Sequence, residues 1–143
     1  MRRERKNSRF LSENPEKTRE IARELAGSLR PGDVLYLYGE LGSGKTVFVK
    51  GLCEGLAVEE NVTSPSFVIA TEYHGRYTIA HVDLYRLDGT AARNLPIEEY
   101  MLASGITVIE WADRISRATS GIVVRIDIVN HQKRAIEIED LRD

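Results

Sequence analysis

The stretch GELGSGKT, residues 39–46, constrains the fold of this chain more than any other feature. It places three glycines, a lysine and a threonine directly after the apolar run VLYLY, residues 34–38, and before a segment whose apolar residues recur at a spacing of four. It satisfies the pattern G-x-x-x-x-G-K-[ST] without a mismatch, in the strand-then-helix setting that the pattern requires. We therefore predict a phosphate-binding loop between a buried strand and a helix over about residues 45–56.

Each residue type in this loop has a chemical role in binding a phosphate. Glycines let the backbone turn tightly, so that successive N–H groups point into one concavity, and the following helix adds its own N-terminal N–H groups and its dipole. We expect Lys45 to reach the phosphate oxygens and the Thr46 hydroxyl to bind Mg²⁺. A plain glycine turn is the alternative, and the apolar flanks argue against it. The residues expected at the nucleotide are Glu40, Leu41, Gly42, Ser43, Gly44, Lys45, Thr46 and, further along the chain, Thr63.

Two acidic residues at the ends of apolar runs are candidates for binding Mg²⁺ and for orienting the attacking water. Glu110 ends ITVI, a clean apolar run, and fits the Mg²⁺ side. Asp83 ends TIAHV and is expected to orient the attacking water or the waters of the metal. Taken alone, either carboxylate is as often a solvated cap or an ion-pair partner. No N-K-x-D guanine motif occurs, which favours ATP. His81 is expected to be a hydrogen-bonded structural histidine.

The pattern of apolar runs and turns predicts the fold class. We expect one domain, residues 1–143, with an α/β, P-loop NTPase-like three-layer fold, in which a mixed sheet has a parallel centre and antiparallel hairpin strands. A basic tail over residues 1–11 is expected to be flexible. The remaining expected elements are a helix capped by Asn14 over residues 14–29, a hairpin of residues 67–73 and 77–87, a helical segment over 90–104 broken near Pro96, a strand over 106–111 and a closing hairpin of 121–130 and 134–140.

Composition narrows the function further. Hydrophobic residues make up 42% of the 143 residues, and the formal net charge of −2 argues against a general nucleic-acid or anionic-membrane binder. No apolar run approaches membrane-spanning length and no signal peptide is visible, so a cytoplasmic protein is expected. The single cysteine, Cys53, falls among the apolar residues of the predicted helix, which indicates a buried thiol and not a nucleophile.

Four segments together resemble the TsaE (YjeE) family, the small P-loop ATPases of bacterial tRNA threonylcarbamoyladenosine synthesis. They are LYGELGSGKT, TSPSF at residues 63–67, HVDLYRL at 81–87 and VIEWADR at 108–114. They occur in the order and at the separations that the family shows. The resemblance runs through most of the chain but matches the C-terminal part only in pattern.

The resemblance implies roles for particular residues. Lys45 and Thr46 would be phosphate and Mg²⁺ ligands, Glu110 a second Mg²⁺ ligand, Asp83 a residue needed for turnover and Trp111 a functional aromatic. The family works with TsaB and TsaD, so this chain would be an accessory ATPase that resets their assembly and not the transferase. Direct contact with tRNA stays open. The segment of residues 63–67 is expected to adopt different conformations with ATP and ADP.

Two other functions remain as alternatives at this point. One is a small-molecule P-loop kinase, which usually has an arginine-bearing lid, and the arginines here are scattered without such an insertion. The other is a nonenzymatic nucleotide sensor. Phosphate release without an added acceptor separates all three. Trp111 is likewise open between a core residue and an anchor for a partner protein.

Overall fold

A computed structural model describes residues 6–40, 42–62, 70–84, 89–94, 96–112 and 120–142 of the chain. Within these ranges the strands are β1 Lys6–Ser12, β2 Val34–Tyr38, β3 Ala70–His74, β4 Thr78–Asp83, β5 Ile106–Glu110, β6 Ile122–Ile128 and β7 Arg134–Asp140. The helices are α1 Pro15–Ala26, α2 Lys45–Gly55, the short α3 Gly89–Asn94 and the 3₁₀ turn η1 Ile97–Tyr100. Their bounds agree closely with the predicted elements around the glycine loop.

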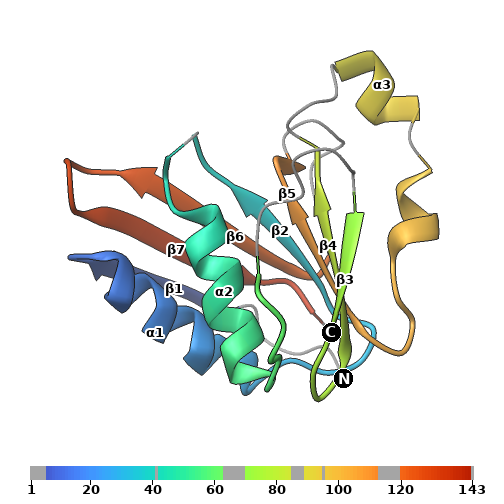
Figure 1. The fold of residues 1–143 in the computed structure, drawn as a ribbon. Coiled ribbons are helices and arrows are strands. Elements are labelled where there is room, and N and C mark those ends of the chain that lie inside the picture. Colours follow the sequence, from blue (N-terminus) through green and yellow to red (C-terminus); the bar gives the residue numbers. More distant parts are fainter. Residues whose placement is uncertain are drawn as a thin grey trace.

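The described strands form one sheet in the order β1-β7-β6-β2-β5-β4-β3 (Figure 1). The four central strands, β6, β2, β5 and β4, run parallel to one another. β3 pairs antiparallel with β4, and β7 pairs antiparallel with β6. The predicted mixed sheet, with a parallel centre and antiparallel hairpin strands, is therefore confirmed.

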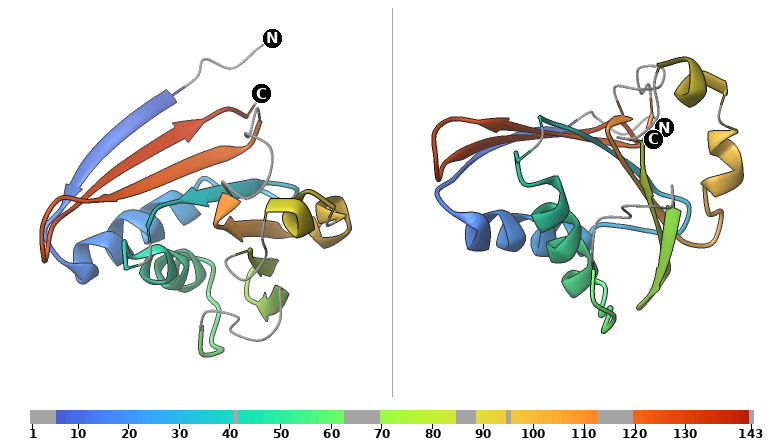
Figure 2. Two further views of the ribbon diagram at one scale, coloured as in Figure 1. Left: turned by 90° about the horizontal axis from the view of Figure 1, so that it is seen from above. Right: turned by 45° about the horizontal axis from the view of Figure 1, so that its top comes forward.

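The two longer helices, α1 and α2, lie together on one face of the sheet (Figure 2). α1 begins as predicted: the side-chain oxygen of Asn14 accepts a hydrogen bond from the N–H of Lys17 at 2.8 Å, and Pro15 occupies the first turn. Such a cap satisfies one of the N–H groups that a helix start leaves unpaired. Ile21 and Ala22 are buried on the side of α1 that packs in the core with α2 and the sheet.

Small residues let α1 and α2 approach closely. A Cβ atom built on Gly51 of α2 would lie 2.4 Å from the carbonyl oxygen of Arg19 and 2.7 Å from the Cβ of Ala22. On the same helix, Cys53 is 1% exposed, and burial raises the pKa of its thiol to about 12. The predicted buried thiol is thus confirmed.

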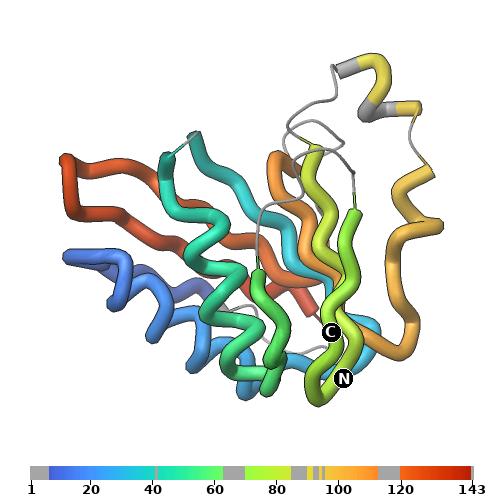
Figure 3. Tube along the Cα trace, in the orientation of Figure 1, coloured from blue at the N-terminus to red at the C-terminus, as the bar shows by residue number. Residues whose placement is uncertain are grey.

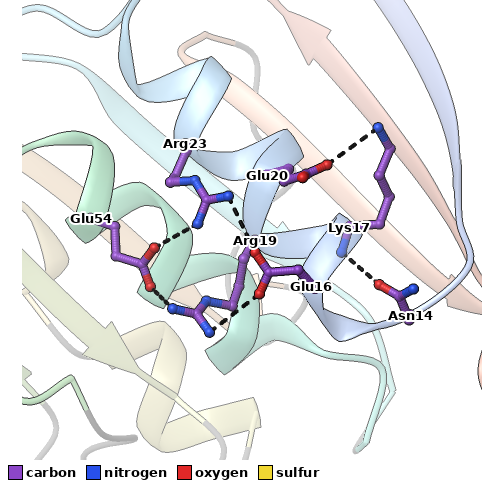
Figure 4. Close-up of polar contacts among 7 residues, drawn as sticks. All are labelled: Asn14, Glu16, Lys17, Arg19, Glu20, Arg23 and Glu54. Atoms are coloured by element: carbon purple, nitrogen blue, oxygen red, sulfur yellow. Dashed lines mark hydrogen bonds and ion pairs between the residues drawn. The ribbon is translucent and has the colours of Figure 1, made fainter.

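Charged side chains join the same two helices at their solvent-exposed rim (Figure 4). Glu54 of α2 accepts hydrogen bonds from Arg23, at 2.8 Å, and from Arg19, both on α1. These two arginines, Arg23 first, lower the pKa of Glu54. Glu16, in the first turn of α1, contacts both arginines. Because the cluster is exposed to water and salt, it adds little to stability, and the helix contact rests mainly on the buried residues.

The opposite face of the sheet carries a smaller apolar cluster. Its buried members are Val82, Leu84, Ile109 and Ala112. Residues of η1 and the position after it, including Tyr100 and Met101, pack against this cluster. The predicted helical segment interrupted near Pro96 therefore covers this face as the short turn η1, preceded by α3.

The expected flexible tail over residues 1–11 is wrong for residues 6–11, which form most of β1. β1 pairs antiparallel with β7 over its whole length, and Arg9 forms an ion pair with Glu137 at 3.1 Å. The basic composition of this segment suggested a solvated tail, but the segment forms a strand that pairs with a strand at the other end of the chain. Residues 1–5 lie outside the described ranges. Among the helices described, none is long and apolar enough to cross a membrane.

The close contact at Gly51 gives a stability prediction. In an isolated helix, replacing glycine by alanine stabilises by about 1 kcal/mol. Here the added methyl group would push against the backbone of α1. We expect Gly51→Ala to lower the free energy of unfolding by about 1–3 kcal/mol in urea denaturation followed by circular dichroism.

Gly27, at the C-terminal end of α1, provides the matched control. Its φ of −64° suits any residue, and the nearest atom to its built Cβ, the carbonyl oxygen of Glu24, is 3.4 Å away. Gly27→Ala should leave stability unchanged or slightly raised. A Gly51→Ala protein as stable as the Gly27→Ala protein would contradict the close helix contact.

Candidate functional site

Parallel pairing brings the glycine loop and the two candidate acids to one edge of the sheet. Glu110, the last residue of β5, is in register with Leu37 of β2 on one side and with Asp83, the last residue of β4, on the other. Residues in register on neighbouring strands turn their side chains to the same face. Leu37 belongs to the core under α1 and α2, so both carboxylates face the α2 side. Figure 3 shows the ends of β2, β5 and β4 at the level where α2 begins.

The glycines of the loop are required by its backbone. Gly42 and Gly44 have φ values of +82° and +105°, a region that side chains disfavour, although nothing lies within 4 Å of a built Cβ at either position. At Gly39 the reason is space, because a Cβ there would lie 2.5 Å from Oγ of Ser43 and 2.7 Å from the carbonyl oxygen of Ile126. Since Gly44 has no side chain to cap α2, the first N–H groups of that helix suit an anion.

Lys45 is a buried cation, with 5% of its surface exposed. Its Nζ donates hydrogen bonds to the carbonyl oxygens of Gly39 and Glu40, the latter at 3.1 Å. The same Nζ lies 3.8 Å from the centroid of the Trp111 ring. These contacts hold the ammonium in the first turn of α2, beside the glycine loop.

Trp111 follows the last residue of β5 in an unusual backbone conformation. The strand, expected to extend to residue 111, ends at Glu110, and Trp111 has a φ of +59°. A bulky residue in the left-handed region costs roughly 1–2 kcal/mol and is held there only by its surroundings. The half-buried ring packs against the cluster formed by Val82, Leu84, Ile109 and Ala112 and also contacts Lys45. Trp111 thus lies at the rim of the loop.

Glu110 and His81 form a buried pair beside this rim. Their side chains are 3% and 0% exposed, and Nε2 of His81 contacts Oε2 of Glu110. The expectation of a hydrogen-bonded structural histidine is confirmed, and its partner is the proposed metal acid. Nδ1 of His81 has no hydrogen-bond partner among the residues that the structure describes. The contact orients the carboxylate of Glu110 toward one fixed position at the strand end.

The structure describes most of the predicted site residues and brings them together. Glu40, Gly42, Ser43 and Gly44 lie in the loop, and Lys45 and Thr46 lie in the first turn of α2. Leu41 and Thr63 lie outside the described residues, as does the rest of the segment 63–69. The hydroxyl of Thr46 and the carboxylate of Glu110 are hard oxygen donors of the kind that Mg²⁺ prefers. Within the described ranges, no cluster of three or more His, Cys, Asp or Glu forms a metal site by itself.

Arg134 is a residue at the loop that the sequence analysis did not single out. It lies 91 and 92 positions away from Ser43 and Gly42 in sequence, and it donates hydrogen bonds to the carbonyl oxygens of both. No sequence pattern in the glycine loop indicates which distant residue contacts it. The contact is therefore seen only in the folded structure, where β7 lies beside the loop.

Comparisons with known proteins agree with this geometry. A family model described as threonylcarbamoyl adenosine biosynthesis protein TsaE matches residues 12–137. The TsaE protein of Bacillus subtilis is 41% identical over 111 residues, which cover 77% of this chain and 70% of that protein. That of Aquifex aeolicus is 34% identical over 131 residues, 90% of this chain and 92% of its own length. The crystal structure of Bacillus subtilis YdiB superposes with a TM-score of 0.79 at 32% identity, covering 97% of this chain and 88% of that one.

The half-buried position of Trp111 gives a second stability prediction. Truncation of a fully buried aromatic side chain costs about 3–5 kcal/mol. Because Trp111 lies at the rim, we expect Trp111→Ala to lower the free energy of unfolding by clearly less. Phe48→Ala is the matched control, since Phe48 on α2 is 0% exposed. If urea denaturation shows equal losses of unfolding free energy for the two variants, Trp111 is a core residue and not a residue at the rim of the loop.

Proposed function

Because the chain belongs to the TsaE family of tRNA threonylcarbamoyladenosine biosynthesis proteins, we propose that it binds and hydrolyses Mg-ATP on the loop of residues 39–46 in support of that modification. The observation that carries the proposal is the buried Lys45, whose charge is contacted by carbonyl oxygens and an aromatic ring at the start of α2. A buried ammonium in the first turn of the helix, beside the N–H groups of a glycine loop, makes a positive site, and a phosphate is the anion that such a loop accommodates.

The residues divide into those that would hold the phosphates and those that would serve the metal and the water. The loop N–H groups and Lys45 would hold the phosphates, while Thr46 and Glu110 would hold Mg²⁺. When bound, the metal neutralises charge that develops on the transferred phosphoryl group. Asp83, half-buried and in register beside Glu110, would orient the water. These roles agree with the register of β4, β5 and β2, which puts all of these residues at one edge.

The accessory role rests on the family resemblance. In this proposal the chain acts on a complex of TsaB and TsaD, and its ATP hydrolysis resets that complex between cycles, while the transfer of the threonylcarbamoyl group belongs to TsaD. Trp111 would serve as the contact for the partner, since an aromatic at a rim is a common interface anchor. Its position against Lys45 would link partner docking to the state of the nucleotide.

A phosphate-release assay tests the enzyme and the partner separately. Purified protein with Mg-ATP and no acceptor should release phosphate slowly, and added TsaB–TsaD should increase the rate. A small-molecule kinase would instead need an acceptor. In cells, loss of the gene should remove threonylcarbamoyladenosine from tRNA, and the wild-type chain should restore it. Unchanged modification in such cells would reject the proposed function.

Removal of the Lys45 charge should abolish the activity. Lys45→Ala takes away a charge-assisted contact to the phosphates, so we expect Mg-ATP affinity to fall about tenfold or more and turnover to fall about 10²–10³-fold. Trp111 is the only tryptophan of the chain, so its emission should change when nucleotide draws Lys45 from its ring, and this change should be lost in the variant. Lys50→Ala, an exposed lysine on the same helix, is the control. Wild-type turnover in Lys45→Ala would reject the phosphate site.

Substitutions of the two acidic residues should have different effects on nucleotide binding and on turnover. Asp83→Asn should retain nucleotide affinity and lose hydrolysis. Glu110→Gln should reduce the Mg²⁺ dependence of nucleotide binding, while its amide oxygen can still accept a hydrogen bond from His81 and keep the fold intact. Calorimetric titrations of ATP at several Mg²⁺ concentrations, together with thermal melts of each variant, distinguish the two. The reverse pattern would exchange the roles assigned to Asp83 and Glu110.

A further inference from the structure

The guanidinium of Arg134 bridges the glycine loop and the turn between β6 and β7. Its Nε donates to the carbonyl oxygen of Ser43 at 3.0 Å, and its Nη2 donates to that of Gly42 at 3.1 Å. Its Nη1 donates to the carbonyl oxygens of Asn130 and Lys133, at 2.9 and 3.0 Å. Each of its three nitrogens therefore has an acceptor, and two successive peptide groups of the loop are tied to β7.

Peptide geometry turns this contact into a constraint on the phosphate side of the loop. A trans peptide group is planar, and its C=O and N–H point in opposite directions. When Arg134 holds the carbonyl of Ser43 on its own side, the N–H of Gly44 must point away from it. The carbonyl of Gly42 fixes the N–H of Ser43 in the same way, and this N–H donates to the carbonyl oxygen of Glu40 within the loop at 3.0 Å. Gly42 and Gly44 have open space around them, so no side-chain packing at either residue would fix these directions.

We propose that Arg134 is a positioning residue, which holds the outer carbonyls of the loop before any nucleotide binds, so that the N–H of Gly44 is directed inward for a phosphate and the N–H of Ser43 keeps its bond within the loop. The inference rests on the proposed function, because it concerns the same loop. It adds a residue from the C-terminal hairpin, where the family resemblance assigns none. It also makes the β6–β7 turn, residues 129–133, part of the support of the site.

Arginine suits this task better than lysine. Its Nε and Nη2 hydrogens lie parallel in one plane, so they match two neighbouring carbonyl oxygens, while Nη1 remains for the turn. A lysine ammonium is a single point with three donors and cannot span both peptide groups and the turn at once. Arg134→Lys therefore keeps the charge and removes the geometry.

The fold should withstand this change. Arg134 is the first residue of β7, and the backbone pairing of β7 with β6 and β1 continues through six further residues on each side. The side chain is half-buried and leaves no buried carboxylate without a partner when it is shortened. A loss of nucleotide affinity without a comparable loss of stability is thus the signature of a positioning role.

The test compares Arg134→Lys with Arg142→Lys. Arg142 is a matched control because it also makes several hydrogen bonds, to Asp33, Asp140 and the carbonyl of Ser28, but away from the loop. We expect Arg134→Lys to raise the Kd of Mg-ATP about tenfold, the effect of about 1.4 kcal/mol, with a melting temperature near wild type. Arg142→Lys should lower the melting temperature and leave the Kd unchanged.

A second readout needs no nucleotide. In the free protein, the amide ¹H–¹⁵N signals of Ser43 and Gly44 should shift in Arg134→Lys and not in Arg142→Lys. Unchanged loop signals and an unchanged Kd would overturn the proposal, as would affinity losses in both variants that follow their losses of stability. If the wild-type protein binds no Mg-ATP, the proposed function fails instead, and the amide signals still decide whether Arg134 positions the loop.

Discussion

The parallel pairing of β2 with β5 is the interaction on which the site depends. It places Glu110 beside Leu37, two residues before the glycine loop begins, and the next parallel pairing places Asp83 beside Glu110. No residue of the loop itself can bring an acid to this position. A shift of one residue in the register of β5 would turn Glu110 to the opposite face and leave the loop without it. The apolar side chains that fix this register therefore support the chemistry as much as the fold.

Buried polar groups are concentrated at this edge of the sheet. Among the described residues, seven buried residues are polar or charged, and four of them, Ser43, Lys45, His81 and Glu110, belong to the loop or the adjacent strand ends. Burial of such groups opposes folding unless they are paired. Lys45 donates to the carbonyl oxygen of Glu40, and Glu110 contacts His81. Polar groups gathered at one edge of an otherwise apolar core are typical of a functional site, where local rules of burial are set aside.

Local patterns account for the parts of the fold that were predicted correctly. The apolar run before the glycine loop, the cap at Asn14 and the apolar runs and turns of the two hairpins each act over a few residues, and β2, α1 and β4 appear where these patterns indicate. β1 was missed because its pairing with β7 joins segments at opposite ends of the chain. Arg134 was missed for the same reason, and the left-handed backbone at Trp111 depends on packing and contacts that no short pattern encodes.

The buried thiol of Cys53 makes the packing of α2 observable in a simple chemical way. Burial raises the pKa of the folded thiol to about 12, so very little of it is ionised at neutral pH, and only 1% of its surface is exposed. An alkylating reagent can therefore modify it only in molecules in which the packing around α2 has opened. The rate of labelling would therefore measure how often the packing around α2 opens. Because the phosphate loop leads into the first turn of α2, a ligand bound at the loop should lower this rate.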